Sequence, residues 1–443
     1  MGMNWQTIKG GFAGLQARGE SLHQRVRGLR RRLTLLLAVV GPGLITSNVD
    51  NDAGGIATYT QSGAQYGYAL LWSLIPMTIA LYVTEEMCAR MGVVTGKGLS
   101  DLIREEFGFR STFFVMIAGF FVDLANVVAE FAGVAASMEM FHVSRYIAVP
   151  IAAVLVWVLV LRGTYRQVEV IFLVACGFYV TYVISAILAK PDWLMAGISL
   201  LPFRGMQVNS GYLLTLTALV GTTIAPWQFF YLQAGFVEKK VGPRQYPQAR
   251  ADVMVGSISC MVIVFFIIVA TAATLNAKGM TSISDAVQAA QALIPLAGKW
   301  AGYTFAFGFL NASLFAATIL PLSTAHVICE GLGFEAGIDN KWHEAKIFYS
   351  LYTVLIVVGA GIILIPNVPL WKIFIFSQVG NGIWLPIVII FILLLINRRD
   401  LMGEYVNSTV FNVVAWVTAI AMIILTLVLV YTGLFQSGPP AGG

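Results

Sequence analysis

Two carboxylates, Asp50 and Asp52, stand beside a glycine pair, Gly54 and Gly55, inside an otherwise apolar run at 34–61. An ionised Asp at the bilayer centre costs about 2.5–3.5 kcal/mol on insertion scales, so it persists only beside a partner or a wet cavity. Because glycine lets the backbone leave the helix, we expect free carbonyl oxygens beside the carboxylates. Together these oxygens would suit a hard cation.

A second apolar run, 209–235, is interrupted near its middle by Gly221 and Pro226, within the sequence GTTIAPWQ. Thr222 and Thr223 would add hydroxyl oxygens opposite the first break. Gly and Pro also kink spanning helices without any functional role, and for this run alone that alternative stands. Interruptions at two corresponding places favour a binding site more than either does alone.

More polar side chains lie inside other apolar runs. Asp123 and Glu130 are seven residues apart, and they therefore share one helix face with Asn126 between them. These acids would line a cation path or a proton route, unless they form an internal hydrogen-bonded scaffold. Gln378 and Asn381 would either line the same cavity or join helices by hydrogen bonds.

Glu85 and Glu86 lie near the end of the run 68–92, close to Arg90. One interpretation is a pair of acids that snorkel to the membrane surface beside the arginine. The alternative is that Glu85 faces the pathway.

The types of side chain that are missing from the two breaks narrow the chemistry. Neither 46–55 nor 221–228 contains a histidine or a methionine. An imidazole relay is therefore not expected there. A site with only oxygen ligands suits Mg²⁺, Ca²⁺ or Mn²⁺ better than softer metals.

Transmembrane helices must position these residues. The 443 residues are 58% hydrophobic and 11% charged, whereas soluble proteins have about 25% charged residues. Runs of about 20 apolar residues cross a hydrocarbon core of about 30 Å. An all-α integral membrane protein is predicted, because a spanning segment must satisfy its own backbone. The eleven expected spans are roughly 34–61, 68–92, 112–140, 146–162, 167–189, 209–235, 252–275, 299–330, 346–366, 370–396 and 410–434.

Lysine and arginine gather in alternate loops, and such loops remain in the cytoplasm. With eleven crossings, this pattern predicts a cytoplasmic N-terminal segment (1–33) and an extracellular C-terminus, in a multi-pass plasma-membrane protein. Five helices in 34–189 and five in 190–397 would form an inverted repeat, because five is odd. Helix 11 and the C-terminus would occupy 398–443.

Several classes of protein are disfavoured. No GxxxxGK[ST] loop is present, so nucleotide binding is not expected, and no catalytic constellation indicates an enzyme. The four cysteines have no CxxC spacing and are interpreted as small apolar side chains. A polar, basic start before a long apolar run does not resemble a cleavable signal peptide. We expect no cofactor and no nucleic acid, and a monomer whose partners are divalent cations and the lipid bilayer.

Several stretches resemble one family. GPGLITSNVDNDAGGIATYTQSGAQYGYALLW (41–72) resembles, without gaps, the first helix of the Nramp divalent metal transporters. ARMGVVTGKGLSDLIREEFG (89–108), AEFAGVAASMEMF (129–141) and LMGEYVNS (401–408) are also similar to stretches of that family. The resemblance covers most of the chain. It implies a LeuT-like fold with an inverted repeat and with helices 1 and 6 broken.

The departures from the family pattern fall at its metal site. Asp52 matches the family's aspartate ligand, whereas Gly55 and Ala225 stand where the family has asparagine and methionine ligands. Trp227 replaces a histidine that the family ties to proton movement. Glu130 matches a family glutamate. Loss of a thioether removes the preference for Mn²⁺, Fe²⁺ and Cd²⁺ over Mg²⁺ and Ca²⁺, and this pattern resembles the Nramp-related magnesium transporters.

The expected function is therefore import of Mg²⁺, and also of Mn²⁺, by alternating access without obligatory proton coupling. Two alternatives are a proton-coupled Mn²⁺/Fe²⁺ transporter and a Na⁺-coupled organic-solute transporter of the same fold. Asp52 is expected to hold the ion, directly or through water. The other expected site and pathway residues are Gly54, Gly55, Thr222 and Ala225 at the ion, with Asp50, Trp227, Gln378, Asn381, Asp123, Glu130 and Glu85 along the cavity or path.

Overall fold

The structure is a computed structural model that describes residues 41–207, 209–281, 299–366 and 370–435. The expected cytoplasmic segment 1–33 and the start of the first span lie outside these residues. All regular structure within the described ranges is helical, which confirms the predicted fold class. The elements are α2 (Pro42–Val49), α3 (Ala53–Tyr66), η1 (Leu71–Ser73), α4 (Leu74–Thr95), α5 (Leu99–Met140), α6 (Arg145–Arg162), α7 (Tyr165–Phe178), α8 (Val180–Leu188), α9 (Trp193–Ile198), α10 (Ser210–Thr223), α11 (Pro226–Glu238), η2 (Pro243–Gln245), α12 (Tyr246–Thr274), η3 (Asn276–Lys278), α14 (Lys299–Leu332), α15 (Lys346–Ile363), α16 (Leu370–Ile396), α17 (Arg399–Met402), η4 (Gly403–Tyr405) and α18 (Thr409–Phe435).

Both predicted helix breaks are present. The first apolar run divides into α2 and α3, with Asp50–Asp52 between them. The second divides into α10 and α11, and only Ile224 and Ala225 separate the two halves. Pro226 is the first residue of α11, where a missing backbone N–H costs nothing.

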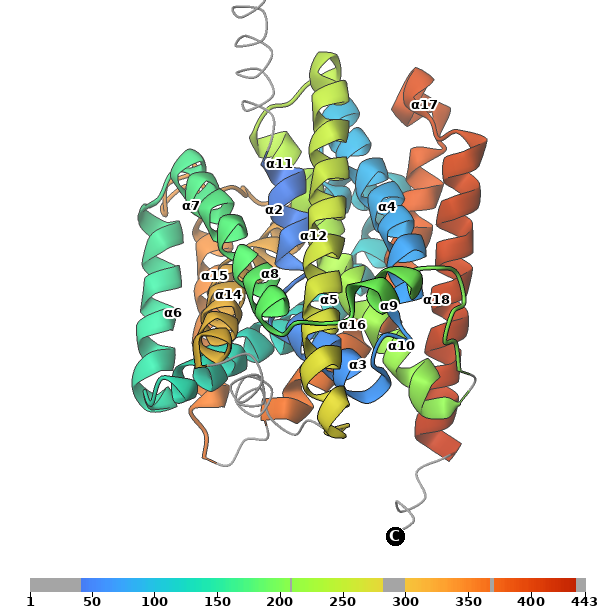
Figure 1. The fold of residues 1–443 in the computed structure, drawn as a ribbon. Helices are drawn as coiled ribbons and strands as arrows, with labels where there is room; N and C mark the ends of the chain where they lie inside the picture. The colour runs from blue at the N-terminus through green and yellow to red at the C-terminus, as the bar shows by residue number, and fades with distance from the viewer. Residues whose placement is uncertain (1–40, 208, 282–298, 367–369, 436–443) are drawn as a thin grey trace, which may run out of the picture.

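Long helices surround the two broken ones. α5 packs along α14 and α16, while α12 lies against α2 and α3, as Figure 1 shows for α12 and α2. Aromatic side chains fill the spaces between these helices. The Phe230 and Trp384 rings stack at a centroid distance of 5.6 Å, which joins α11 to α16. The broken helices are therefore enclosed by unbroken ones.

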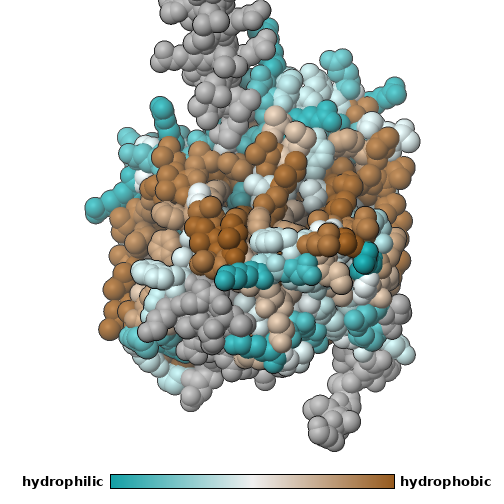
Figure 2. All heavy atoms as spheres, viewed as in Figure 1, coloured by the Kyte–Doolittle hydropathy of each residue, from teal (hydrophilic) through white to brown (hydrophobic). Residues whose placement is uncertain are grey.

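The outer helices carry an apolar surface. Ile151 and Leu155 on α6 are 61% and 53% exposed, and Val417 and Ile424 on α18 are 59% and 55% exposed. Figure 2 shows hydrophobic side chains over both flanks of the molecule, and hydrophilic ones mainly toward its two ends. Such large exposed apolar areas are matched by lipid rather than by water.

Eight helices among the described residues are long and apolar enough to cross a membrane, or up to nine if one bent pair counts as a single span. The predicted total of eleven spans is therefore not confirmed and stays a prediction. α5 also begins earlier than the expected span, at Leu99 instead of residue 112. Gly108, with φ of 78°, interrupts α5. It separates a short helical part, which was expected to be a loop, from the apolar part that follows.

Candidate metal site

Asp52 begins α3 as its N-cap. Its side chain accepts a hydrogen bond of 2.6 Å from the backbone N–H of Gly55. Gly54 and Gly55 lie inside the first turn of α3, so the expectation that they interrupt the helix is wrong. The interruption is at Asp50–Asp52 because the cap at Asp52 starts a new helix there.

The carbonyl oxygens of the break are partly occupied by tyrosines. Tyr59 donates to the Asp50 carbonyl at 3.3 Å, and Tyr179 donates to the Asn51 carbonyl at 3.3 Å. Asn48 and Val220, in the last turns of α2 and α10, accept hydrogen bonds of 3.1 and 3.0 Å from Asn51 and Ile224. The other carbonyls of these last turns have no partner further along their own helix, because each helix ends there. Free backbone oxygens are thus offered by the ends of α2 and α10, rather than by Gly54.

The two breaks approach each other at Gly55. A Cβ on Gly55 would lie 2.5 Å from the Asp50 carbonyl oxygen, 3.2 Å from Asp52 Oδ1 and 3.3 Å from Thr222 Oγ1. Only glycine fits there, so the space that an asparagine side chain would need is taken by the Asp50 carbonyl. Thr222 Oγ1 is buried and has no hydrogen-bond partner in the described chain. The geometry therefore brings Asp52 and Thr222 together, as predicted.

The second break places apolar groups beside these oxygens. Ala225 is the N-cap of α11 and is 2% exposed, while Trp227 is fully buried. The Trp227 carbonyl accepts a hydrogen bond of 2.9 Å from Ser323 on α14, but its indole N–H has no partner among the described residues. Neither residue supplies a soft donor atom.

α5 reaches the first break through Glu130. Glu130 Oε2 accepts a hydrogen bond of 3.2 Å from the backbone N–H of Ala53. Two turns earlier, Asp123 accepts one of 2.8 Å from Thr324 on α14. One oxygen of each acid has no partner in the described parts of the chain, so the two acids are only partly satisfied by the scaffold. A pathway role for both stays a prediction.

The amides of α16 join the first break to α5. A Cβ on Gly54 would contact the Gln378 side chain. Asn381 donates to Gln378 at 3.2 Å and also to Asn126 at 3.2 Å, so the three amides form a chain. Gln378 and Asn381 therefore lie beside the site, and they also make the interhelical hydrogen bonds that were the alternative.

Glu85 and Glu86 are both buried, so the snorkelling interpretation is wrong for this pair. Glu86 forms an ion pair of 2.8 Å with Arg90, which is itself buried. Glu85 accepts hydrogen bonds of 2.7 Å from Ser47 and 2.9 Å from Ser257. It therefore contacts α2 directly, one turn before the break.

Sequence reasoning missed Asp252 on α12. Its carboxylate accepts hydrogen bonds from the backbone N–H groups of Gly41, Gly43 and Leu44, at 3.2, 2.7 and 3.2 Å. It thus satisfies the free amides at the start of α2. An acid at the beginning of an apolar run was the available signal, although it did not indicate the partner.

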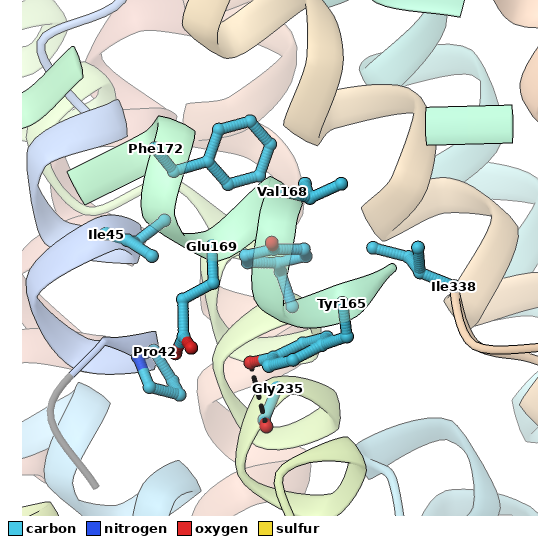
Figure 3. Close-up of a pocket in the computed structure, with 9 residues that line it drawn as sticks. Pro42, Ile45, Tyr165, Val168, Glu169, Phe172, Gly235 and Ile338 are labelled. Carbon is cyan, nitrogen blue, oxygen red and sulfur yellow. Dashed lines mark hydrogen bonds between the residues drawn. The ribbon is translucent and has the colours of Figure 1, made fainter. Parts of the chain in front are cut away.

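The start of α2 also packs against α7 and α11. Figure 3 shows Pro42 and Ile45 of α2 facing Glu169 and Phe172 of α7 across a small pocket. Tyr165 donates a hydrogen bond of 3.4 Å to the Gly235 carbonyl (Figure 3). Glu169 forms an ion pair of 2.6 Å with Lys239. At this end of the molecule, α2 is fixed against its neighbours.

Replacement of Asp252 by Ala should release this end of α2. Three amides, two of them buried, lose their acceptor, at about 1 kcal/mol each. About 3 kcal/mol corresponds to a fall of about 3 °C in the melting temperature of a chain this long. Thermal unfolding in detergent measures the change. Asp252→Asn keeps one acceptor oxygen and should lose less, so equal losses in the two variants would argue against the capping role.

The site is closed to solvent in this conformation. Asp50 and Asn51 are fully buried and Asp52 is 3% exposed. No group of three His, Cys, Asp or Glu side chains that could hold a metal is found within the described ranges. Among the described residues, an ion at Asp52 would therefore be held by at most two such side chains together with hydroxyl, carbonyl or water oxygens.

An all-helical membrane bundle whose two broken helices meet at a buried carboxylate defines a secondary transporter with discontinuous helices. Residues 43–432 match the family model described as natural resistance-associated macrophage protein-like, Nramp. The chain belongs to the Nramp family. It is therefore a membrane transporter and not an enzyme.

Known relatives agree with this assignment. The chain is 29% identical over 414 residues to the divalent metal cation transporter MntH of Deinococcus radiodurans, with 90% of each protein covered. MntH of Burkholderia ambifaria is 26% identical over 421 residues, with 92% of this chain and 91% of that protein covered.

Solved structures show the same fold. The Eremococcus coleocola manganese transporter matches with a TM-score of 0.75 at 22% identity, over 92% of this chain and 89% of that one. Mhp1, a nucleobase-cation-symport-1 family transporter, matches with a TM-score of 0.56 at 14% identity, over 91% of this chain and 95% of that one. These likenesses confirm the LeuT-like fold.

Proposed function

We propose that this protein imports Mg²⁺, and also carries Mn²⁺, by alternating access without obligatory proton coupling. The observation that carries the proposal is the set of donor atoms where the broken helices meet. Asp52 and Thr222 offer oxygen, and Ala225 offers no donor side chain. A site with hard oxygen ligands and no thioether does not favour softer metals over Mg²⁺. This pattern resembles that of the Nramp-related magnesium transporters, which supports the proposal.

Transport of a dication needs no proton gradient. The membrane potential contributes about 2.3 kcal/mol per charge per 100 mV, and twice that for Mg²⁺. Trp227 stands on α11 beside the break, and its indole has no proton to exchange at physiological pH. The four histidines of the chain all lie outside 46–55 and 221–228.

A proton-coupled Mn²⁺/Fe²⁺ transporter is the second candidate, and one contact favours it. Glu130 reaches the amide of Ala53 beside Asp52, and Asp123 lies two turns away on the same helix. These acids could carry protons while the ion moves. The relatives named as divalent metal cation or manganese transporters also fit this candidate. The third candidate, Na⁺-coupled transport of organic solutes, has only the shared fold in its favour.

The proposal includes a topology. The protein would lie in the plasma membrane as a monomer, with the start of α2 toward the cytoplasm and the C-terminus outside, as the basic loops indicate. The division into two inverted five-helix units, 34–189 and 190–397, belongs to the same proposal.

Competition uptake in proteoliposomes tests the proposed function. Mg²⁺, Mn²⁺ and Ca²⁺ are offered at two pH values, with a pH dye inside the vesicles. We expect Mg²⁺ to enter and to compete with Mn²⁺, without acidification of the interior. Acidification that follows metal entry would favour the proton-coupled candidate, and Mn²⁺ entry that excess Mg²⁺ does not reduce would contradict the proposed substrate.

A further inference from the structure

Asp50 is a buried carboxylate at the end of α2. Its side chain is 0% exposed, and neither carboxylate oxygen has a hydrogen-bond partner among the described residues. The same holds for the free oxygen atoms of three other fully buried side chains near it: Thr46 Oγ1, Asn51 Oδ1 and Glu85 Oε1. Buried polar atoms are nearly always paired, so a group of them indicates that something else fills their bonds.

Contacts of Glu85 with α2 and α12 place it about one helical turn from Asp50. Glu85 contacts Ser47 on α2, and Asp50 follows Ser47 by three residues, a rise of about 4.5 Å. On α12, Glu85 contacts Ser257, while Asn51 contacts Cys260 three residues further on, with 3.6 Å between Nδ2 and Sγ.

The side chains on α2 also face one another. Thr46 precedes Asp50 by four residues and so lies on the same face of α2. The unpaired oxygens thus lie where α2, α4 and α12 pack together, at the end of α2.

The chemistry of this group suits a cation. Two ionised carboxylates in a dry interior repel each other, and either a proton on one of them or a cation between them relieves the repulsion. The hydroxyls of Ser47 and Ser257 hold Oε2 of Glu85 and leave Oε1 free, as second-layer partners do for a metal ligand. All the donors are oxygen atoms, which are the ligands of hard divalent cations.

We propose that Asp50 and Glu85, with Thr46 and Asn51, form a second station for the transported divalent cation. The inference rests on the proposed function. The station extends from the break toward the start of α2, which is the cytoplasmic side in the proposed topology. Two dications this close repel strongly, so a single ion occupies Asp52 first and the second station next, on its way out.

Equilibrium binding of Mn²⁺ to the full chain in detergent tests the station directly, with free Mn²⁺ measured by electron paramagnetic resonance. The wild type should bind one ion. Asp52→Asn should still bind one, about tenfold or more weakly, and Asp52→Asn/Glu85→Gln should bind none. No binding to Asp52→Asn, or binding that Glu85→Gln leaves unchanged, would overturn the proposal. If Glu85 has only a structural role and no second station exists, Asp52→Asn should bind no Mn²⁺.

A matched control removes a carboxylate elsewhere. Glu139 on α5 forms an ion pair of 2.6 Å with Arg145, so Asp52→Asn/Glu139→Gln should keep the residual Mn²⁺ binding. In liposomes, Glu85→Gln should lower Mn²⁺ uptake about tenfold while Asp52 still binds the ion, and Glu85→Asp should restore part of the rate. Wild-type uptake by Glu85→Gln would overturn the station.

Failure of the station is distinguishable from failure of the proposed function. Mn²⁺ is the probe in both the binding and the uptake measurement. Both measurements therefore still test the second station if Mg²⁺ proves not to be carried.

Discussion

Replacing Asp52 with Ala is expected to abolish Mg²⁺ uptake into proteoliposomes. Asp52 is the carboxylate where the two broken helices meet, and its Oδ1 would lie 3.2 Å from a Cβ on Gly55, as Thr222 Oγ1 would at 3.3 Å. Loss of one partner of a buried ion pair costs about 3–5 kcal/mol. At 1.4 kcal/mol per factor of ten, binding weakens about 100-fold or more.

Two controls separate the charge of Asp52 from its cap. Asp52→Asn keeps an oxygen that can accept from the Gly55 amide, so α3 should still be capped, yet uptake should be lost with the charge. Asp192→Ala removes another aspartate cap, at α9, where the side chain accepts a bond of 2.9 Å from Met195. That variant should transport normally. Near-wild-type uptake by Asp52→Asn would contradict an ionic role for Asp52.

The sequence was sufficient to predict both helix breaks because each contains residues that a lipid-spanning helix rarely tolerates. Pro226 fixes the start of α11, and Asp52 is a strong N-cap for α3. The first break was expected within 48–55, and it lies there, at Asp50–Asp52, but it does not include the glycines. Glycine signals conformational freedom but does not require its use, and Gly54 and Gly55 remain helical because Asp52 caps the helix before them.

Long-range partners were beyond the reach of sequence reasoning. Asp252 caps α2 from 209 and 211 residues away along the chain. Local charge suggested that Glu85 snorkels beside Arg90, yet Glu85 turns instead toward the serines of α2 and α12. Packing among α2, α4 and α12 decides which face of α4 is buried. The sequence of one apolar run does not indicate how it packs against other helices.

Ion selectivity depends on what the site lacks as much as on what it contains. Gly55 is fixed by the close approach of the Asp50 carbonyl, so an asparagine ligand cannot be restored there without moving the backbone. Ala225 differs, because its backbone has an extended conformation (φ −86°, ψ 137°) that any residue can adopt, so a substitution there causes no backbone strain. It is therefore the position where selectivity can be tested with one substitution.

Ala225→Met is expected to shift selectivity toward Mn²⁺ and Cd²⁺ and away from Mg²⁺. Ala225 caps α11 at the second break with an extended backbone (φ −86°, ψ 137°), so a longer side chain there would begin beside the site. A thioether is a soft ligand that Mg²⁺ does not use. One such bond worth about 1.4 kcal/mol changes the Mn²⁺ to Mg²⁺ ratio about tenfold.

Ala225→Leu is the matched control for this selectivity change, since leucine is close to methionine in volume but has no sulfur. Any side chain added at a position only 2% exposed costs about 1–3 kcal/mol in packing, so both variants should carry less metal in total. Competition uptake with Mg²⁺, Mn²⁺ and Cd²⁺ then isolates the sulfur. Only the methionine variant should gain Mn²⁺ and Cd²⁺ relative to Mg²⁺. An equal shift in the leucine variant would show that side-chain size, and not the sulfur, sets the selectivity. An unchanged profile in both variants would show that position 225 does not influence selectivity.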